Sequence, residues 1–278
     1  MTLRTISSVL FALLVAVATL AAPARATEII VQSTTSTKNA GLYDYLAPKI
    51  RAATGITIRV VAVGTGQAIR NAQNCDGDLL LVHAKAAELA FVQAGYGSER
   101  RDLMYNDFVI VGPAKDPADV VSAKTAAGAL AKIAASGSTF TSRGDDSGTH
   151  KKELALWAAS GVDPSSASGT WYRETGSGMG ATLNVGVGMG AYVLVDRATW
   201  LTFGNKADFA VLFEGDPALF NQYGVIPVSA KACPSVKADA ARKVADWLVS
   251  PEGQSAIGGY QRAGRQLFFP NANAKPAG

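Results

Sequence analysis

The chain has 278 residues, 48% of them hydrophobic, and a formal net charge of +4. This length is enough for a buried core in one large domain or two smaller ones. The positive surplus is small and no cluster of Lys and Arg with interleaved aromatic residues occurs, which argues against a nucleic-acid-binding protein. Two histidines and two cysteines without ligand-like spacing argue against a zinc site.

Residues 1–26 have the pattern of a secretory signal peptide. Arg4 supplies the positive region, Val9 to Leu20 form an apolar run, and Ala24-Arg25-Ala26 is a small-x-small cleavage pattern. We therefore expect an exported mature chain that begins at Thr27. Its formal charge is +2, because Arg4 and Arg25 are removed and no acidic residue is lost.

The two cysteines, Cys75 and Cys233, lie far apart in the sequence. In an exported protein they either form one disulfide that closes a long loop or remain two buried thiols. The sequence leaves both alternatives open.

The first half of the mature chain alternates apolar strands with helices. Leu42, Leu46 and Ile50 recur at helical spacing, which predicts a helix that ends before Gly55 and that Pro48 kinks or splits. Predicted strands occupy residues 28–32, 56–63, 78–83 and 104–111. Such an alternation predicts an α/β fold with a mostly parallel sheet covered on both faces. His83 ends one strand, where a packed, hydrogen-bonded side chain is favoured over a ligand or base.

The second half continues this alternation. The sequence predicts a helix-rich stretch over 118–136, a helix over 148–160, a short strand from Trp171, strands over 191–195, 209–213 and 225–228, and an amphipathic helix over 238–249. Ser250 and Pro251 then predict a second helix, with Ser as its N-cap and Pro at its first position.

Three junctions between a strand and the next helix are rich in hydroxyl groups and glycine. They are the run from Ser33 to Thr37, the Thr65-Gly66 pair, and the loop from Thr141 to Thr149. Glycine lets the backbone approach a ligand closely, and helix N-termini present unpaired N–H groups. Together these junctions supply hydrogen-bond donors suited to a small oxyanion.

The loop before the helix over 148–160 is the strongest of the three. A helix that begins near Ser147 favours a negative group at that end, and Arg143 adds a planar fork of donors. His150, Lys151 and Lys152 place excess positive charge in the first turn, which a bound anion would explain. The alternative is that Asp145 and Asp146 cap the helix and that Arg143 pairs with one of them on a solvated loop.

A fourth glycine and hydroxyl junction covers residues 176–182, ahead of Gly186, Gly188 and Gly190. A flexible loop followed by glycines that allow close helix packing explains it at least as well as a ligand role.

Enzyme motifs fit poorly. The sequence Gly144-Asp145-Asp146-Ser147-Gly148 is not G-x-S-x-G, and His150 follows Ser147 on the same helical turn, so a hydrolase that uses Ser147 is a minor alternative. No Lys follows Gly148 directly, which argues against a P-loop. The first strand-to-helix turn lacks G-x-G-x-x-G, so the dinucleotide-binding fingerprint is missing.

Several motifs resemble the tungstate-binding proteins of bacterial ABC importers (Tup type). They are T-T-S-T (34–37), V-G-T-G-Q-A (63–68), L-L-V-H-A (80–84), M-Y-N-D-F-V-I-V-G-P (104–113), S-R-G-D-D-S-G-T-H-K-K-E (142–153) and E-G-D-P-A-L-F-N (214–221). The ending W-L-V-S-P-E-G-Q (247–254) resembles the C-terminal helix pair of many extracytoplasmic binding proteins. The likeness covers nearly the whole mature chain.

The resemblance implies a two-lobed periplasmic binding protein of type II, a monomer without enzymatic activity or cofactor, that passes its anion to a permease and an ATPase. It implies a first lobe over 27–110 and 225–278, a second over 111–224, and a hinge near Val109 and Val225. The residues implied to line the cleft are Thr34, Thr35, Ser36, Thr37, Thr65, Gly66, Arg143, Ser147, Gly148 and Thr149. Ser33 stands where relatives often have another Thr, and Ser177 where they often have Gln.

The residue types favour one class of anion. Tungstate, molybdate and sulfate are fully ionised near neutral pH and need only donors, whereas phosphate keeps a proton that needs a carboxylate acceptor. Two of the three junctions carry no carboxylate, and Asp145 and Asp146 would be occupied as helix caps. We therefore expect a dianion, with phosphate as the alternative. The preference for tungstate over molybdate or vanadate is implied only by the resemblance.

Overall fold

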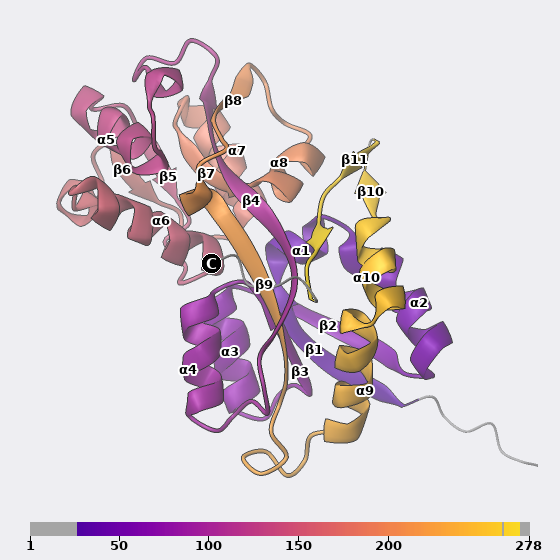
Figure 1. Cartoon of the computed structure of the whole chain (residues 1–278). Helices are drawn as coiled ribbons and strands as arrows, with labels where there is room; N and C mark the ends of the chain where they lie inside the picture. Colours follow the sequence, from indigo (N-terminus) through magenta and orange to yellow (C-terminus); the bar gives the residue numbers. More distant parts are fainter. Residues whose placement is uncertain (1–26, 263, 273–278) are drawn as a thin grey trace, which may run out of the picture.

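The chain folds into two lobes that are joined by two long strands. The computed structural model describes residues 27–262 and 264–272, so the predicted signal peptide lies outside the described residues. The connecting strands, β4 (Arg101–Pro113) and β9 (Phe220–Pro227), run side by side between the lobes (Figure 1). No helix in the described ranges is long and apolar enough to cross a membrane. The architecture is the two-lobed α/β fold that the sequence predicts.

The sheet of the first lobe is parallel over three strands at one end. β1 (Glu28–Thr34) pairs in parallel with both β2 (Thr57–Val63) and β3 (Leu79–Val82). β9 lies antiparallel to β3, and β4 lies antiparallel to β9, which gives the strand order β12-β4-β9-β3-β1-β2, where β12 is Phe269–Pro270. The chain enters the second lobe along β4 and returns along β9, so these two strands must run in opposite directions.

Helices cover both faces of this sheet. Side chains of successive β3 residues alternate: Leu79 and Leu81 join one core and Leu80 and Val82 join the other, as expected for a strand buried on both faces. The first core is closed by α2 (Leu42–Thr54), α9 (Ala238–Val249) and α10 (Pro251–Gly258), and the second by α3 (Thr65–Gln73) and α4 (Lys85–Gln93).

Two local predictions in this lobe need correction. The hydroxyl run after β1 is not a loop, because Thr35–Asn39 forms the short helix α1. Pro48 does not divide α2, which is one helix that ends at Gly55 in the left-handed conformation, with φ 74°. The predicted helix pair at the end is confirmed: Ser250 accepts a hydrogen bond from the Gly253 N–H at 3.2 Å.

The second lobe surrounds the far half of β4. β7 (Val193–Asp196) and β8 (Phe209–Phe213) pair antiparallel with β4, and β5 (Phe140–Ser142) pairs in parallel with β6 (Tyr172–Glu174). Its helices are α5 (Ala126–Ser136), α6 (Gly148–Ser160), α7 (Met179–Met189) and α8 (Arg197–Thr202). Three 3-10 turns lie at Val120–Ser122, Pro164–Ala167 and Pro217–Leu219. Outside this lobe, β10 (Gln261–Arg262) and β11 (Arg265–Gln266) form a small hairpin after α10.

The long strands contribute to both sets of cores. Leu103 and Met104 of β4 pack in the first lobe, whereas Phe108 and Ile110 pack in the second. The pairing register of β4 shifts twice, between Asp102 and Met104 against β9 and between Ile110 and Val111 against β8. The lobe boundaries near residues 110 and 225 stay predictions.

Cys75 and Cys233 form a disulfide, which decides between the two alternatives that the sequence left open. Both cysteines belong to the first lobe and pack in the same core as α3 and α4. The bond therefore joins two segments of the first lobe to each other, although the loop that it closes passes through the second lobe.

Candidate functional site

The starts of α3 and α6 meet between the lobes. The Gly66 N–H donates to the Asp146 carbonyl at 3.2 Å, which joins the first lobe to the second. A Cβ atom on Gly148 would lie 2.7 Å from His83 Cε1 and 2.9 Å from Thr65 Oγ1. Only glycine permits this approach, so the predicted residues Thr65, Gly66 and Gly148 come together.

Three helix N-termini near this place have no side-chain cap in the described part of the chain. Among the described residues, no side chain caps the first turn of α1, α3 or α7, whose N-cap residues are Thr34, Gly64 and Gly178. Helix α6 differs, since Ser147 Oγ accepts from the His150 N–H at 3.2 Å. Uncapped N–H groups and the helix dipole attract a negative group.

Four buried donors in the predicted site have no hydrogen-bond partner within the described part of the chain. They are the hydroxyl groups of Thr35, Thr65 and Thr149 and the Nε of Arg143. Buried polar groups in proteins are nearly always paired, and an unpaired one costs about 1–3 kcal/mol. Four unpaired donors on three segments that are distant in sequence therefore indicate a site for a ligand that accepts hydrogen bonds.

Thr34 and Ser36 are placed differently. Thr34 Oγ1 lies 2.8 Å from Thr37 Oγ1 and 3.3 Å from Ser36 Oγ, so these hydroxyl groups bond to one another. Ser33 is fully buried and its Oγ bonds to Tyr43 and, at 2.7 Å, to the Leu81 carbonyl. Its hydroxyl group therefore belongs to the core of the first lobe.

Arg143 is buried, with 3% of its surface exposed, and its Nη2 donates to Asp145 Oδ2 at 2.5 Å. Asp145 Oδ1 also accepts from the Ser147 N–H at 3.2 Å. The alternative in which Arg143 pairs with an aspartate on a solvated loop was thus correct about the pair and wrong about the solvated loop. It was also wrong about the N-cap, which is Ser147.

The positive charge in the first turn of α6 has local partners. Lys151 forms an ion pair with Asp146, which also accepts from Arg70 Nη1 of the first lobe at 3.2 Å. Lys152 Nζ donates to the Ala218 carbonyl at 2.8 Å. Lys151 is thus neutralised by an aspartate and Lys152 is not, so the prediction that a bound anion explains the excess charge stays a prediction. Both aspartates of the loop are engaged in ion pairs.

Two buried titratable side chains support the site from behind. Glu153 accepts from Ser142 Oγ at 2.8 Å and from the Tyr172 hydroxyl at 2.6 Å, and burial raises the pKa of its carboxyl group to about 7. His83 Nδ1 lies 3.0 Å from Asn221 Oδ1, and burial lowers the pKa of its imidazole to about 4. The prediction of a packed, hydrogen-bonded His83 is confirmed. The role of Glu153 was missed, although a lone acid in an apolar helical segment was a visible signal.

The fourth junction contributes mainly to packing. A Cβ atom on Gly186 would lie 2.5 Å from Val193 Cγ2, so this glycine lets α7 approach β7, as the packing alternative required. Ser177 Oγ donates to the Thr175 carbonyl at 3.1 Å. Gly178 nevertheless faces the site, since a Cβ atom there would lie 3.8 Å from Thr35 Oγ1.

Ser147 has the contacts of a helix cap. Its hydroxyl group accepts from the His150 N–H, and His150 Nδ1 accepts from the Asp146 N–H at 3.1 Å. The other imidazole, of His83, is bonded to Asn221. Neither histidine therefore forms the hydrogen bond to Ser147 that would activate a nucleophile.

Comparisons with known proteins agree with this geometry. The PBP superfamily domain matches residues 21–252. The tungstate-binding protein TupA of Peptoclostridium acidaminophilum is 47% identical over 248 residues, which cover 88% of this chain and 86% of the relative.

Two solved structures are similar over most of the chain. The tungstate-binding protein TupA of Desulfovibrio alaskensis G20 is 49% identical with a TM-score of 0.76, and the match covers 89% of this chain and all of that one. The tungstate ABC transporter protein of Geobacter sulfurreducens is 46% identical with a TM-score of 0.76, over 84% of this chain and 98% of that one. The chain belongs to the PBP superfamily and, within it, to the family of the TupA proteins.

Proposed function

We propose that this protein binds a tetrahedral oxyanion, tungstate, between its lobes in the periplasm and delivers it to the permease and ATPase of an ABC importer. It acts as a monomeric binding protein without catalysis. The observation that carries the proposal is the set of four buried, unpartnered donors on Thr35, Thr65, Arg143 and Thr149. The names of the similar TupA proteins supply the identity of the anion.

The donor set assigns different parts to the predicted site residues. The hydroxyl groups of Thr35, Thr65 and Thr149 and the Arg143 guanidinium donate directly to the anion. Gly66 and Gly148 permit the close approach of the lobes, because a Cβ atom at either position would clash with the facing residues. The Gly66 N–H does not donate to the anion, since it is already bonded to the Asp146 carbonyl. Three further residues form the wall of the site and orient its backbone: Thr34, Ser36 and Ser147.

The site offers donors but no free carboxylate acceptor from the loop. Asp145 is bonded to Arg143 and to the Ser147 N–H, and Asp146 is bonded to Lys151 and Arg70. Phosphate, which keeps a proton near neutral pH, would leave that proton without an acceptor, at a cost of about 1–3 kcal/mol. A fully ionised dianion is therefore favoured. Tungstate and molybdate have the same charge and shape, so the choice between them relies on the relatives.

Thermal unfolding of the mature protein with excess tungstate, molybdate, vanadate, sulfate or phosphate tests this function. A ligand at about a thousandfold over its dissociation constant should add about 4 kcal/mol to the free energy of unfolding. Absence of stabilisation by every one of these oxyanions would refute the proposal.

The change Arg143→Lys should weaken tungstate binding at least about tenfold, because a hydrogen bond to a charged group contributes about 1.5–3 kcal/mol and Lys cannot reproduce the planar fork. Arg59→Lys is the control, since Arg59 pairs with Glu28 on the surface. Equal affinities of the two variants would remove Arg143 from the site.

A further inference from the structure

A cavity lies between the lobes next to the proposed oxyanion site, with which it shares Gly148. It has a volume of about 410 Å³, within the range of small-molecule sites. Its walls come from the start of α4, the first turns of α6 and the strand β9. Gly148 and His83, which contact each other across the lobes, contribute to its lining and separate it from the oxyanion site.

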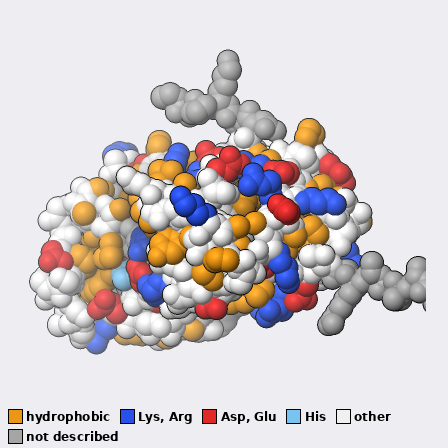
Figure 2. Space-filling view, turned by 90° about the horizontal axis from the view of Figure 1, so that it is seen from below, with side chains coloured by type: hydrophobic (Ala, Val, Ile, Leu, Met, Phe, Trp, Pro, Cys, Tyr) orange, Lys and Arg blue, Asp and Glu red, His pale blue; other side chains and the backbone are white. Residues whose placement is uncertain are grey.

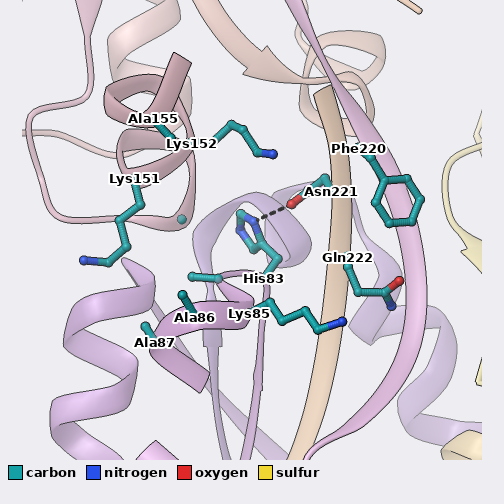
Figure 3. A pocket seen from close by; sticks show the side chains of 12 residues that line it. His83, Lys85, Ala86, Ala87, Lys151, Lys152, Ala155, Phe220, Asn221 and Gln222 are labelled. Carbon is teal, nitrogen blue, oxygen red and sulfur yellow. Dashed lines mark hydrogen bonds between the residues drawn. The ribbon is translucent and has the colours of Figure 1, made fainter. Parts of the chain in front are cut away.

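The lining of this interlobe cavity is cationic. Lys85, Lys151 and Lys152 line it, and none of the lining residues is acidic. Figure 3 shows Lys152 extending from α6 on one side of His83 and Asn221 and Lys85 on the other side, whereas the Lys151 side chain points away from them. The outer surface differs from this cavity lining, since Lys and Arg side chains are interspersed with Asp and Glu side chains over the face shown in Figure 2.

Two of these cations form no ion pair within the described residues. Lys151 is paired with Asp146, whereas Lys152 Nζ donates to the Ala218 carbonyl and Lys85 has no carboxylate partner in the described ranges. Burial lowers the pKa of the Lys152 ammonium group, and the charge of Asp216 partly offsets this effect. Ammonium groups without an ion-pair partner on opposite walls of one cavity favour a ligand with at least two anionic groups.

The remaining walls are apolar. Four alanines and one aromatic ring line the cavity, namely Ala84, Ala86, Ala87, Ala155 and Phe220. Phe220 is 45% exposed and packs against Tyr105 with ring centroids 5.0 Å apart, so one face of a rigid aromatic side chain remains available. Asn221 and Gln222 add amide groups.

From this combination we infer that the interlobe cavity binds a small organic anion with two carboxylates or similar groups and an apolar body. Lys85 and Lys152 neutralise its charged ends from opposite lobes, and the alanines and Phe220 contact its body. Because both lobes build the walls, such a ligand binds the closed form better than the open form. It must therefore strengthen oxyanion binding, and the oxyanion must strengthen its binding by the same factor.

Isophthalate tests the cavity, and its uncharged analogue isophthalamide controls for shape. Calorimetry on the tungstate-saturated protein should show isophthalate binding, because saturation blocks competition at the oxyanion site, and no binding of isophthalamide. The double variant Lys85→Ala/Lys152→Ala should bind isophthalate at least about tenfold more weakly, consistent with the loss of two charge-assisted contacts. Lys231→Ala, an exposed lysine outside the cavity lining, should leave its affinity unchanged.

Coupling is measured by titrating tungstate with and without saturating isophthalate. We expect at least about fivefold tighter tungstate binding with isophthalate in the wild type and no such gain in the double variant. Absence of isophthalate binding at millimolar concentrations, or binding that the double variant retains, would overturn the inference. Failure of tungstate to bind would refute the proposed function separately, since isophthalate binding and its loss in the double variant can be measured without tungstate.

Discussion

Replacing Thr149 by Val tests two effects of its hydroxyl group separately: the cost of the unpaired hydroxyl group to the stability of the ligand-free protein, and its contribution to tungstate binding. Thr149 is fully buried in the first turn of α6, and its Oγ1 has no partner among the described residues. Val has nearly the same shape and helix propensity but no hydroxyl group. The ligand-free protein therefore loses no hydrogen bond, and its stability should hold or rise by up to about 1–3 kcal/mol.

The ligand complex should respond in the opposite direction. A hydrogen bond to an ionised acceptor contributes about 1.5–3 kcal/mol, so Thr149→Val should raise the tungstate dissociation constant about tenfold to 150-fold. Denaturant unfolding without ligand and calorimetry with tungstate give the two quantities on the same sample.

Thr54→Val is the matched control. Thr54 is also buried, but its Oγ1 donates to the Ile50 carbonyl at 2.6 Å and accepts from the Ile56 N–H at 3.1 Å, far from the site. This variant should lose stability and keep its tungstate affinity. If Thr149→Val instead behaves like Thr54→Val, the Thr149 hydroxyl is paired inside the protein and the argument from unpaired donors is refuted.

Four further outcomes are expected. The pKa of His83 in the folded protein is about 4, below the ordinary 6.5, so the contribution of the neutral imidazole to stability is complete above pH 6.5 and is lost as the pH falls toward 4. In pH-dependent unfolding, the wild type should therefore lose about 3 kcal/mol relative to His83→Gln across that window. The carboxyl group of Glu153 has its pKa raised to about 7, so Glu153→Gln should gain stability relative to wild type as the pH rises from 4.5 through 7, and a constant difference would contradict the burial argument. Reduction of the disulfide, which joins residues 158 positions apart, should lower the free energy of unfolding by about 2–5 kcal/mol while the tungstate affinity changes little, since both cysteines belong to one lobe. Arg70→Ala should weaken tungstate binding by no more than about fivefold, and less at high salt, because the ion pair between Arg70 and Asp146 across the lobes is half exposed. If calorimetry shows a larger loss that does not depend on salt, Arg70 contacts the anion directly.

Local signals in the sequence were enough for most elements. The sequence predicted α6 over Gly148–Ser160, and Ser250 with Pro251 predicted the start of α10. These features depend on residues within one or two turns, so no knowledge of distant contacts is needed.

The long strands were underestimated for a nonlocal reason. Asn221 and Gln222 precede the apolar run of β9, so the predicted strand began only at residue 225, whereas the predicted strand over 104–111 already included Asn106 and Asp107 of β4. In the structure Asn221 Nδ2 donates to Asn106 Oδ1 at 2.6 Å, and the strands continue through this polar pair. The pairing of residues 115 positions apart cannot be read from hydrophobic periodicity.

The predicted site residues were brought together largely as expected, but their partners were not foreseen. Asp145, Asp146 and Ser147 are consecutive N-cap candidates, and propensity alone does not choose among them. The structure selects Ser147 because the two carboxylates are taken by Arg143, Lys151 and Arg70. Arg70 lies 76 positions away, so this selection depends on how the lobes meet.

The two register shifts of β4 have a consequence for recognition by a membrane transporter. The shifts lie within the packed parts of β4, beside Met104 of the first lobe and Ile110 of the second, so the strand passes from one lobe to the other in the stretch between them, over residues 105–107. Rotation concentrated there leaves the internal packing of each half unchanged. A transporter that distinguishes cargo-laden from empty protein must then measure the relative orientation of two otherwise constant surfaces, which requires simultaneous contact with both halves.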